Sequence, residues 1–223
     1  MQGKQIPNED TFTNNGFTLV PLHQNATNNI HNHMMATKVC FAQLGKKAAV
    51  KEYGQAAVAA ILKEVKQLEG KKTFMAHAIH ELTEMERQRA LRSITLVTQK
   101  RNRIIKGRTV ADGRKQRDYI PRDDITSPTI STEALMLSLA IDAHEGRYVA
   151  TADVEGAYLH ADMDDKVIMV FEGEMVDYMI AINPEYEKYV HTTKTEKHFL
   201  YVQLLKALYG CIQSALLWFK IFT

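Results

Sequence analysis

The chain has 223 residues, 45% of them hydrophobic and 24% charged, so it can bury a sizeable core as one large domain or two small ones. This composition excludes a wholly disordered chain, a collagen and a coiled coil. No apolar run is long enough for a membrane-spanning helix, and no N-terminal basic-then-apolar stretch resembles a signal peptide. The two cysteines, Cys40 and Cys211, are too few for a disulfide scaffold and favour a reducing intracellular compartment, the cytoplasm or the nucleus.

A net charge of +2 conceals a strongly basic band. Between Arg87 and Arg122 there are twelve Lys or Arg residues against two Asp residues, a local net charge of +10, so the remainder of the chain carries −8. Such a band is either a solvated face or a surface for a nucleic-acid backbone, because each Lys or Arg that pairs with a phosphate releases counterions.

The first predicted elements are helical. Residues 1–45 are rich in Asn and Thr and lack periodicity, which predicts a loosely ordered leader. From about residue 46, apolar residues recur at steps of three and four and predict an amphipathic helix that Gly70 ends. Its apolar stripe consists of Val50, Tyr53, Ala57, Ile61, Val65 and Leu68.

A second helix, a strand and a hairpin are predicted next. Thr83 and Glu86 have the spacing of a capping box that opens a short helix. This helix runs into Ile94–Thr98, which alternates like a strand. The basic stretch from Lys100 to Arg117 is typical of a hairpin with its turn at Arg101–Arg103.

The second half of the chain alternates between helices and strands. Ser131 or Thr132 is predicted to cap a helix that ends near His144, with Gly146 as its terminator. We expect three strands, at residues 147–154, 166–171 and 199–205, and a final helix from Lys206 onward. The pattern therefore predicts an α+β fold in which an antiparallel sheet is backed by helices.

Asp153 is the strongest candidate for a chemical role. It lies at the end of the predicted strand 147–154, where a carboxylate is poorly solvated unless it is paired or bound to a cation. Mg²⁺ is the hard, oxygen-seeking cation that suits such a site when phosphates are also bound. The alternative is a carboxylate that accepts hydrogen bonds from the backbone of the following turn.

Several segments occur in the order of one known family. Thr151–Leu159 (TADVEGAYL) resembles the first catalytic motif of the reverse transcriptase of copia-type LTR retrotransposons. Four further segments resemble parts of the same enzyme: Gly107–Arg117 with its Gly-x-x-Gln signature at 113–116, Ser127-Pro128-Thr129, Val167–Met169 and Leu205–Gly210. The resemblance covers residues 46–223.

The resemblance implies a partial fingers–palm polymerase fold. Residues 46–125 would form a fingers-like region of helices and the basic hairpin, and residues 126–223 a partial palm. Asp153 would be the catalytic carboxylate and, with the backbone carbonyl of Val154, a ligand of Mg²⁺. Tyr158 would be the gate whose ring excludes a ribose 2′-hydroxyl and so selects deoxynucleotides.

The resemblance also implies binding residues and partners. Lys106 and Arg108 would hold the triphosphate of the incoming nucleotide, and Tyr209 and Gly210 would line its pocket. The partners would be an RNA template, a DNA primer and dNTPs. The basic side chains that would contact nucleic acid are Arg101, Arg103, Arg114, Lys115 and Arg117.

The second carboxylate motif of the family, Y-x-D-D, is absent from the sequence. Met163-Asp164-Asp165 follows Asp153 too closely and corresponds to a solvated acidic loop of the family. We therefore expect a fragment of a copia-type polyprotein that is inactive alone and can self-associate through open sheet edges. The alternative is a non-catalytic nucleic-acid-binding remnant that uses the basic band of residues 87–122.

Overall fold

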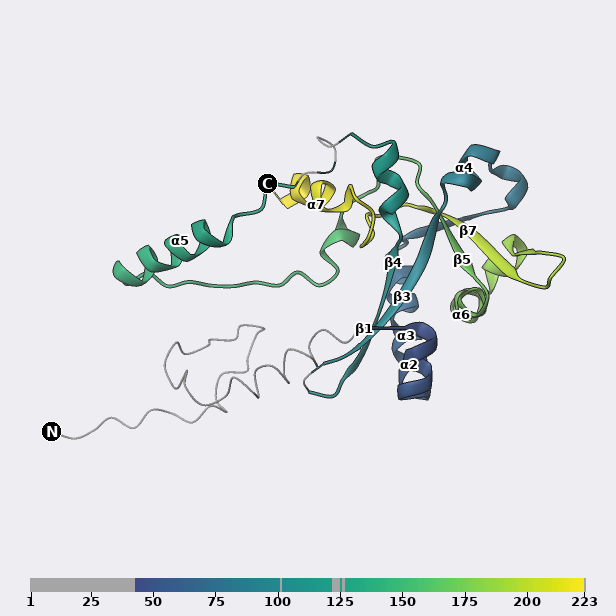
Figure 1. Ribbon diagram of the computed structural model, residues 1–223, viewed down its shortest axis with the longest axis horizontal. Coiled ribbons are helices and arrows are strands. Elements are labelled where there is room, and N and C mark those ends of the chain that lie inside the picture. Colours follow the sequence, from purple (N-terminus) through teal and green to yellow (C-terminus); the bar gives the residue numbers. More distant parts are fainter. Residues whose placement is uncertain (1–42, 101, 122–124, 126, 223) are drawn as a thin grey trace. The chain divides into compact units, whose positions relative to one another are not determined.

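The computed structural model describes residues 43–100, 102–121, 125 and 127–222 (Figure 1). The predicted leader as far as residue 42, Cys40 and Arg101 lie outside these residues. The described residues form two compact units: the smaller consists of residues 129–155, and the larger consists of the described residues from 43 to 128 together with those from 156 onward.

The predicted first helix is confirmed, but it is divided into two. Helix α2 spans Lys46–Tyr53 and helix α3 spans Gln55–Gly70, with Gly54 between them at φ +53°. The part of the predicted stripe that lies on α3 is buried, with 0–2% of each residue exposed: Ala57, Ile61, Val65 and Leu68. This stripe packs into the main hydrophobic core.

The larger unit is built on a mixed sheet, in agreement with the predicted α+β class. Its strands are β1 (Gln43–Gly45), β2 (Phe74–His77), β3 (Leu91–Gln99), β4 (Ile105–Ala111), β5 (Ile168–Glu172), β6 (His191–Thr192) and β7 (His198–Leu204). The strand order is β1-β3-β5-β7-β2, with β4 paired to β3 and β6 paired to β7. All these pairs are antiparallel except β3–β5, which is parallel.

Strand β3 belongs to both halves of the sheet. Its first two residues, Leu91 and Arg92, pair with β5, and its remainder pairs with β4 along the whole hairpin. The turn of this hairpin is closed by hydrogen bonds from the N–H of Lys100 to the carbonyl of Ile104 and from the N–H of Arg103 to the carbonyl of Lys100. A hairpin that turns after Lys100 is therefore confirmed, but it ends at Ala111, because residues Gly113–Asp118 form a 3-10 helix and not the end of a strand. Strand β3 connects the hairpin directly to the central strands.

The core lies between the sheet and the helices α3 and α6 (Glu174–Ile182). Its largest fully buried side chain is that of Phe171, which meets Phe74 edge to face, with 5.5 Å between the ring centroids. Met175, Val176 and Met179 are the buried residues of α6. This helix was not among the elements predicted from the sequence.

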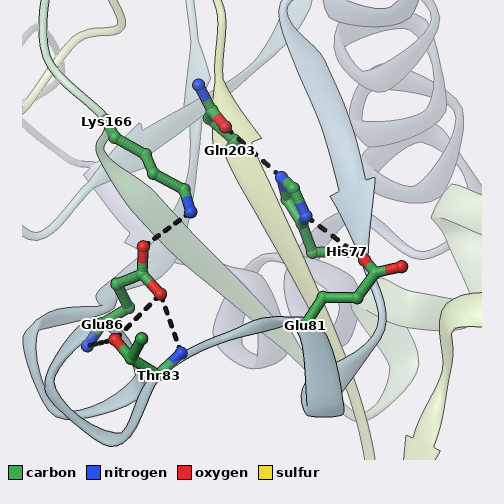
Figure 2. Close-up of polar contacts among 6 residues, drawn as sticks. All are labelled: His77, Glu81, Thr83, Glu86, Lys166 and Gln203. Atoms are coloured by element: carbon green, nitrogen blue, oxygen red, sulfur yellow. Dashed lines mark hydrogen bonds and ion pairs between the residues drawn. The ribbon is translucent and has the colours of Figure 1, made fainter.

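The segment before β3 covers the other face of the central strands. It contains the 3-10 helix η1 (Ile79–Glu81) and helix α4 (Glu84–Arg89). Leu82 and Ala90 of this segment pack on Ile168 and Val170 of β5. Figure 2 shows the polar contacts of this segment with the sheet. His77 Nδ1 on β2 lies 3.3 Å from Glu81 Oε2, and His77 Nε2 lies 3.3 Å from Gln203 Oε1.

The capping box that opens α4 is confirmed. The N–H of Glu86 donates to Thr83 Oγ1 at 3.2 Å, and the N–H of Thr83 donates to Glu86 Oε2 at 2.8 Å (Figure 2). Lys166 Nζ lies 2.6 Å from the other oxygen of the same carboxylate. The hydrogen bond from Lys166, with those from Thr83, lowers the pKa of Glu86 from 4.5 to about 2.

This lowered pKa predicts a contribution of Glu86 to acid unfolding. A carboxylate with a lowered folded-state pKa stabilises the fold fully above its ordinary pKa, and the contribution is lost as the pH falls from 4.5 to about 2. We expect Glu86→Gln to remove this part of the pH dependence, measured as the urea midpoint between pH 6 and pH 2. Glu84→Gln on the same helix is the control, and an equal effect of both substitutions would contradict the prediction.

The final helix begins later than predicted. Helix α7 spans Ser214–Phe222, and the stretch from Lys206 to Gln213 is irregular. This stretch is extended at first, because Lys206 pairs with Asp162 and the N–H of Ala207 donates to the carbonyl of Ala161. These contacts with the segment that precedes β5 prevent a helix from starting at Lys206.

The smaller unit contains helix α5 (Thr132–His144), and its predicted cap is confirmed. Ser131 Oγ accepts a hydrogen bond from the N–H of Ala134 at 3.2 Å. The strand predicted at residues 147–154 is wrong: these residues are irregular. Their alternating pattern favours a strand, but alternation alone does not form one, because the backbone N–H and C=O groups of a strand also need a partner.

Candidate functional site

The structure brings together residues that were predicted to bind a nucleotide. They come from strand β4, from the 3-10 helix η4 (Ala157–His160) and from the loop between β7 and α7. The guanidinium carbon of Arg108 lies 4.7 Å from the centroid of the Tyr209 ring. The rings of Tyr158 and Tyr209 are 4.5 Å apart and tilted by 41°. Gly210 follows Tyr209 directly and is exposed.

Strand β4 presents both predicted cations on one face. Lys106 and Arg108 are exposed and two residues apart, so their side chains leave the strand on the same side. Across the hairpin they pair with Thr98 and Leu96 of β3. We therefore conclude that Lys106 belongs to the same face of the hairpin as Arg108.

A carboxylate of α3 covers the outer edge of β4. Glu64 Oε1 accepts a hydrogen bond from the backbone N–H of Thr109 at 3.1 Å. Burial raises the pKa of Glu64, against the opposing effects of this hydrogen bond and of the charges of Lys106 and Arg108. Glu64 was not among the candidate residues of the sequence analysis, because helical periodicity shows which residues of α3 face the core but not which strand a polar residue contacts.

The loop that carries Tyr209 lies very close to the end of β4. The backbone N–H of Ala111 donates to the carbonyl of Tyr209 at 2.8 Å. Gly210 has φ +94°, and a Cβ atom added there would lie 1.9 Å from the Ala111 carbonyl oxygen. A Cβ added to Gly113 would lie 2.2 Å from the Gly210 carbonyl oxygen. The two backbones can approach this closely only because both residues are glycines.

Gln116 also connects the segment after β4 to the loop that carries Tyr209. Its side chain is fully buried, and its Oε1 accepts a hydrogen bond from the backbone N–H of Ile212 at 3.1 Å. Gly113 and Gln116 lie in the 3-10 helix η2 (Gly113–Asp118). The Gly-x-x-Gln signature of the sequence therefore has a structural explanation, because both of its named residues contact the loop that carries Tyr209.

Tyr158 is supported by helix α7. Ala161, Ala207 and Leu217 form a small buried cluster, and Tyr158 packs against it. The neighbouring ring of His160 lies 6.0 Å from that of Trp218, the single tryptophan of the chain. The predicted gate residue therefore has packing contacts on the side of α7 in addition to its contact with Tyr209.

Some of the side chains predicted to contact nucleic acid are exposed, whereas others already interact with protein groups. Arg103 in the hairpin turn and Arg117 in η2 are exposed. Lys115 Nζ donates to the carbonyl of Gln88 at 3.4 Å. Arg114 is engaged by Asp112 through two hydrogen bonds of 2.7 and 2.6 Å, which lower the pKa of that carboxyl group.

Asp153 and Val154 belong to the smaller unit, where both are exposed. Within the described ranges, no group of three or more His, Cys, Asp or Glu side chains is placed to hold a metal ion. Asp164 and Asp165 lie in the exposed acidic loop, and Asp165 accepts a hydrogen bond from Gln213 at 2.6 Å.

Comparison with known proteins identifies the family. A family model described as reverse transcriptase (RNA-dependent DNA polymerase) matches residues 87–223. The Gag-Pol polyproteins of transposons Ty1-DR4 and Ty1-NL2 from Saccharomyces cerevisiae are each 28% identical to this chain over 158 residues, which is 71% of the chain and 9% and 8% of their own lengths. No solved structure matches.

The chain belongs to the reverse transcriptase (RNA-dependent DNA polymerase) family. Its relatives are transposon polyproteins, as the copia-type motifs predicted, and it spans less than a tenth of their length. The match favours a retrotransposon polymerase fragment over the alternative of a non-catalytic nucleic-acid binder. None of the helices in the described part of the chain is long and apolar enough to cross a membrane.

Proposed function

We propose that this chain supplies the fingers and part of the palm of an RNA-directed DNA polymerase, and that its larger unit binds the incoming dNTP. The observation that supports this proposal is the continuous contact from Arg108 through Tyr209 to Tyr158. These residues come from three segments that are distant in the sequence. Together they offer a cation for a triphosphate and an aromatic ring for a sugar.

The cations of β4 are suited to the triphosphate. Arg108 can form paired, charge-assisted hydrogen bonds with phosphate oxygens, and Lys106 adds a second charge on the same face. The contact between Glu64 and the backbone of Thr109 holds β4 against α3, so the two cations extend from a fixed strand. Tyr158 would then lie beside the sugar, where its ring blocks a 2′-hydroxyl.

Asp153 would supply one carboxylate of the catalytic centre. The backbone carbonyl of Val154 would lie beside it. The resemblance to reverse transcriptases implies that this centre would use Mg²⁺, which would stabilise the charge of the transferred phosphate. Such a centre needs more carboxylates than the described residues bring together.

Basic side chains of the hairpin and η2 would contact the RNA template and the DNA primer. Arg103, Lys115 and Arg117 are the described candidates, and Arg101 remains a candidate from the sequence. Arg114 would contribute less, because Asp112 already engages it.

Nucleotide binding by the purified chain tests this proposal. We expect Arg108→Ala to weaken the binding of dGTP by roughly 10- to 100-fold, because a hydrogen bond to a charged group contributes about 1.5–3 kcal/mol. Equilibrium dialysis in the presence of Mg²⁺ measures the dissociation constant.

Arg89→Ala is the matched control. Arg89 is also in the basic band and also stacks on a tyrosine, Tyr119, at 4.7 Å, but it lies on α4. An equal loss of affinity in both variants would show that binding is spread over the basic band, and it would contradict the proposed site.

A further inference from the structure

We propose that Tyr209 is a positioning residue that holds both Arg108 and Tyr158 for the incoming nucleotide. The affinity for the triphosphate and the discrimination between deoxyribose and ribose would then depend on one side chain. This inference rests on the proposed function, because it concerns the nucleotide site proposed above.

The Tyr209 ring is in contact with both groups at once. The Arg108 guanidinium lies over it at 4.7 Å, and the Tyr158 ring lies 4.5 Å from its centroid. Arg108 is exposed, and its charge acts on the carboxyl group of Glu64, whose pKa it lowers. The Tyr209 ring is the group that lies directly against the guanidinium, so it limits the positions of this long side chain.

Tyr209 itself is held firmly. Its carbonyl accepts the N–H of Ala111, which lies three residues after Arg108 on the same strand. The next residue, Gly210, lies between the backbones of Ala111 and Gly113 with no space for a side chain. These contacts fix the position of the Tyr209 ring relative to β4. Because Tyr158 packs against this ring, the position of Tyr158 is limited as well.

Tyr158 depends on the same ring for one side of its packing. On its other side it packs against the cluster of Ala161, Ala207 and Leu217. Shortening Tyr209 to leucine removes the aromatic support but keeps an apolar side chain of moderate size. Tyr158 could then adopt additional rotamers, and its ring would exclude a 2′-hydroxyl less strictly.

Isothermal titration of the purified chain tests the inference, with inorganic tripolyphosphate, dGTP and GTP as probes. We expect Tyr209→Leu to weaken tripolyphosphate binding about threefold, the size of an exposed cation–π contact. The preference for dGTP over GTP should fall as well. Tyr209→Phe should preserve both properties, because the ring remains.

Two comparisons separate positioning from a general structural effect. In the Arg108→Ala background, Tyr209→Leu should cause no further loss of tripolyphosphate binding, because it acts through that arginine. Tyr119→Leu removes a stack of the same 4.7 Å distance from Arg89 and should change none of the three affinities. Additive losses, or an unchanged ratio of dGTP to GTP affinity, would overturn the inference.

A measurement without ligand distinguishes a failure of this inference from a failure of the proposed function. The Nε–H signal of Arg108 in the NMR spectrum should be shifted by the ring in the wild type and in Tyr209→Phe, and should move in Tyr209→Leu. If the signal moves as expected but Arg108→Ala binds dGTP like the wild type, the proposed nucleotide site is wrong. If the signal does not respond to Tyr209→Leu, the positioning role is wrong.

Discussion

Replacing Gly210 with alanine is expected to destabilise the larger unit by about 3 kcal/mol. A positive φ such as the +94° of Gly210 costs a residue with a side chain about 1–2 kcal/mol, and forcing atoms into a packed site typically costs about 1–3 kcal/mol more. The added Cβ would lie 1.9 Å from the carbonyl oxygen of Ala111, which is backbone and cannot rotate away. Urea unfolding followed by circular dichroism measures the loss.

Gly70→Ala is the matched control for this substitution. A Cβ at Gly70 meets nothing within 4 Å, and the residue ends helix α3. The control should be neutral or slightly stabilising, because alanine favours a helix over glycine by about 1 kcal/mol. If Gly210→Ala unfolded at the same urea concentration as the wild type, the close approach of Gly210 to Ala111 would be wrong.

Replacing Asp153 with asparagine is expected to lower the rate constant of nucleotide incorporation about a thousandfold in an active polymerase that contains this chain. The amide keeps the size of the side chain but removes its charge, and electrostatic stabilisation by a metal centre contributes several kcal/mol to such reactions. Primer extension on an RNA template, measured as single-turnover incorporation of one dNTP, gives the rate.

The acidic loop supplies the control for this experiment. Asp164→Asn makes the same chemical change at an exposed carboxylate that we do not place in the catalytic centre. It should retain most of the wild-type rate. A similar loss in Asp164→Asn would mean that the acidic loop, rather than Asp153 alone, contributes to the centre.

The features that were predicted well from the sequence depend on local contacts. The capping box of Thr83 and Glu86 and the cap at Ser131 involve residues three positions apart, so their geometry follows from spacing. The buried stripe of α3 follows from helical periodicity. The hairpin was predictable for the same reason, because its two strands are consecutive.

The features that were missed depend on partners elsewhere in the chain. Residues 147–154 have the pattern of a strand, but their backbone is irregular, because alternation does not by itself supply a partner strand. The residues from Lys206 to Gln213 have helical motifs, but their contacts with Ala161 and Asp162 hold the first of them extended. In the candidate site, the family motifs predicted Arg108 and Tyr209 individually, whereas their stacking and the position of Glu64 emerge only from the packing of β4.

The close junction at the end of β4 restricts how the hairpin can move. One end is fixed to the loop that carries Tyr209, through Ala111 and Gln116, and Glu64 holds the outer edge farther along. The opposite end, at Asn102–Ile104, is exposed. Because β1 also pairs with Leu96–Thr98 of β3, the hairpin is held as far as those residues, and bending over a bound substrate would be greatest at Asn102–Ile104.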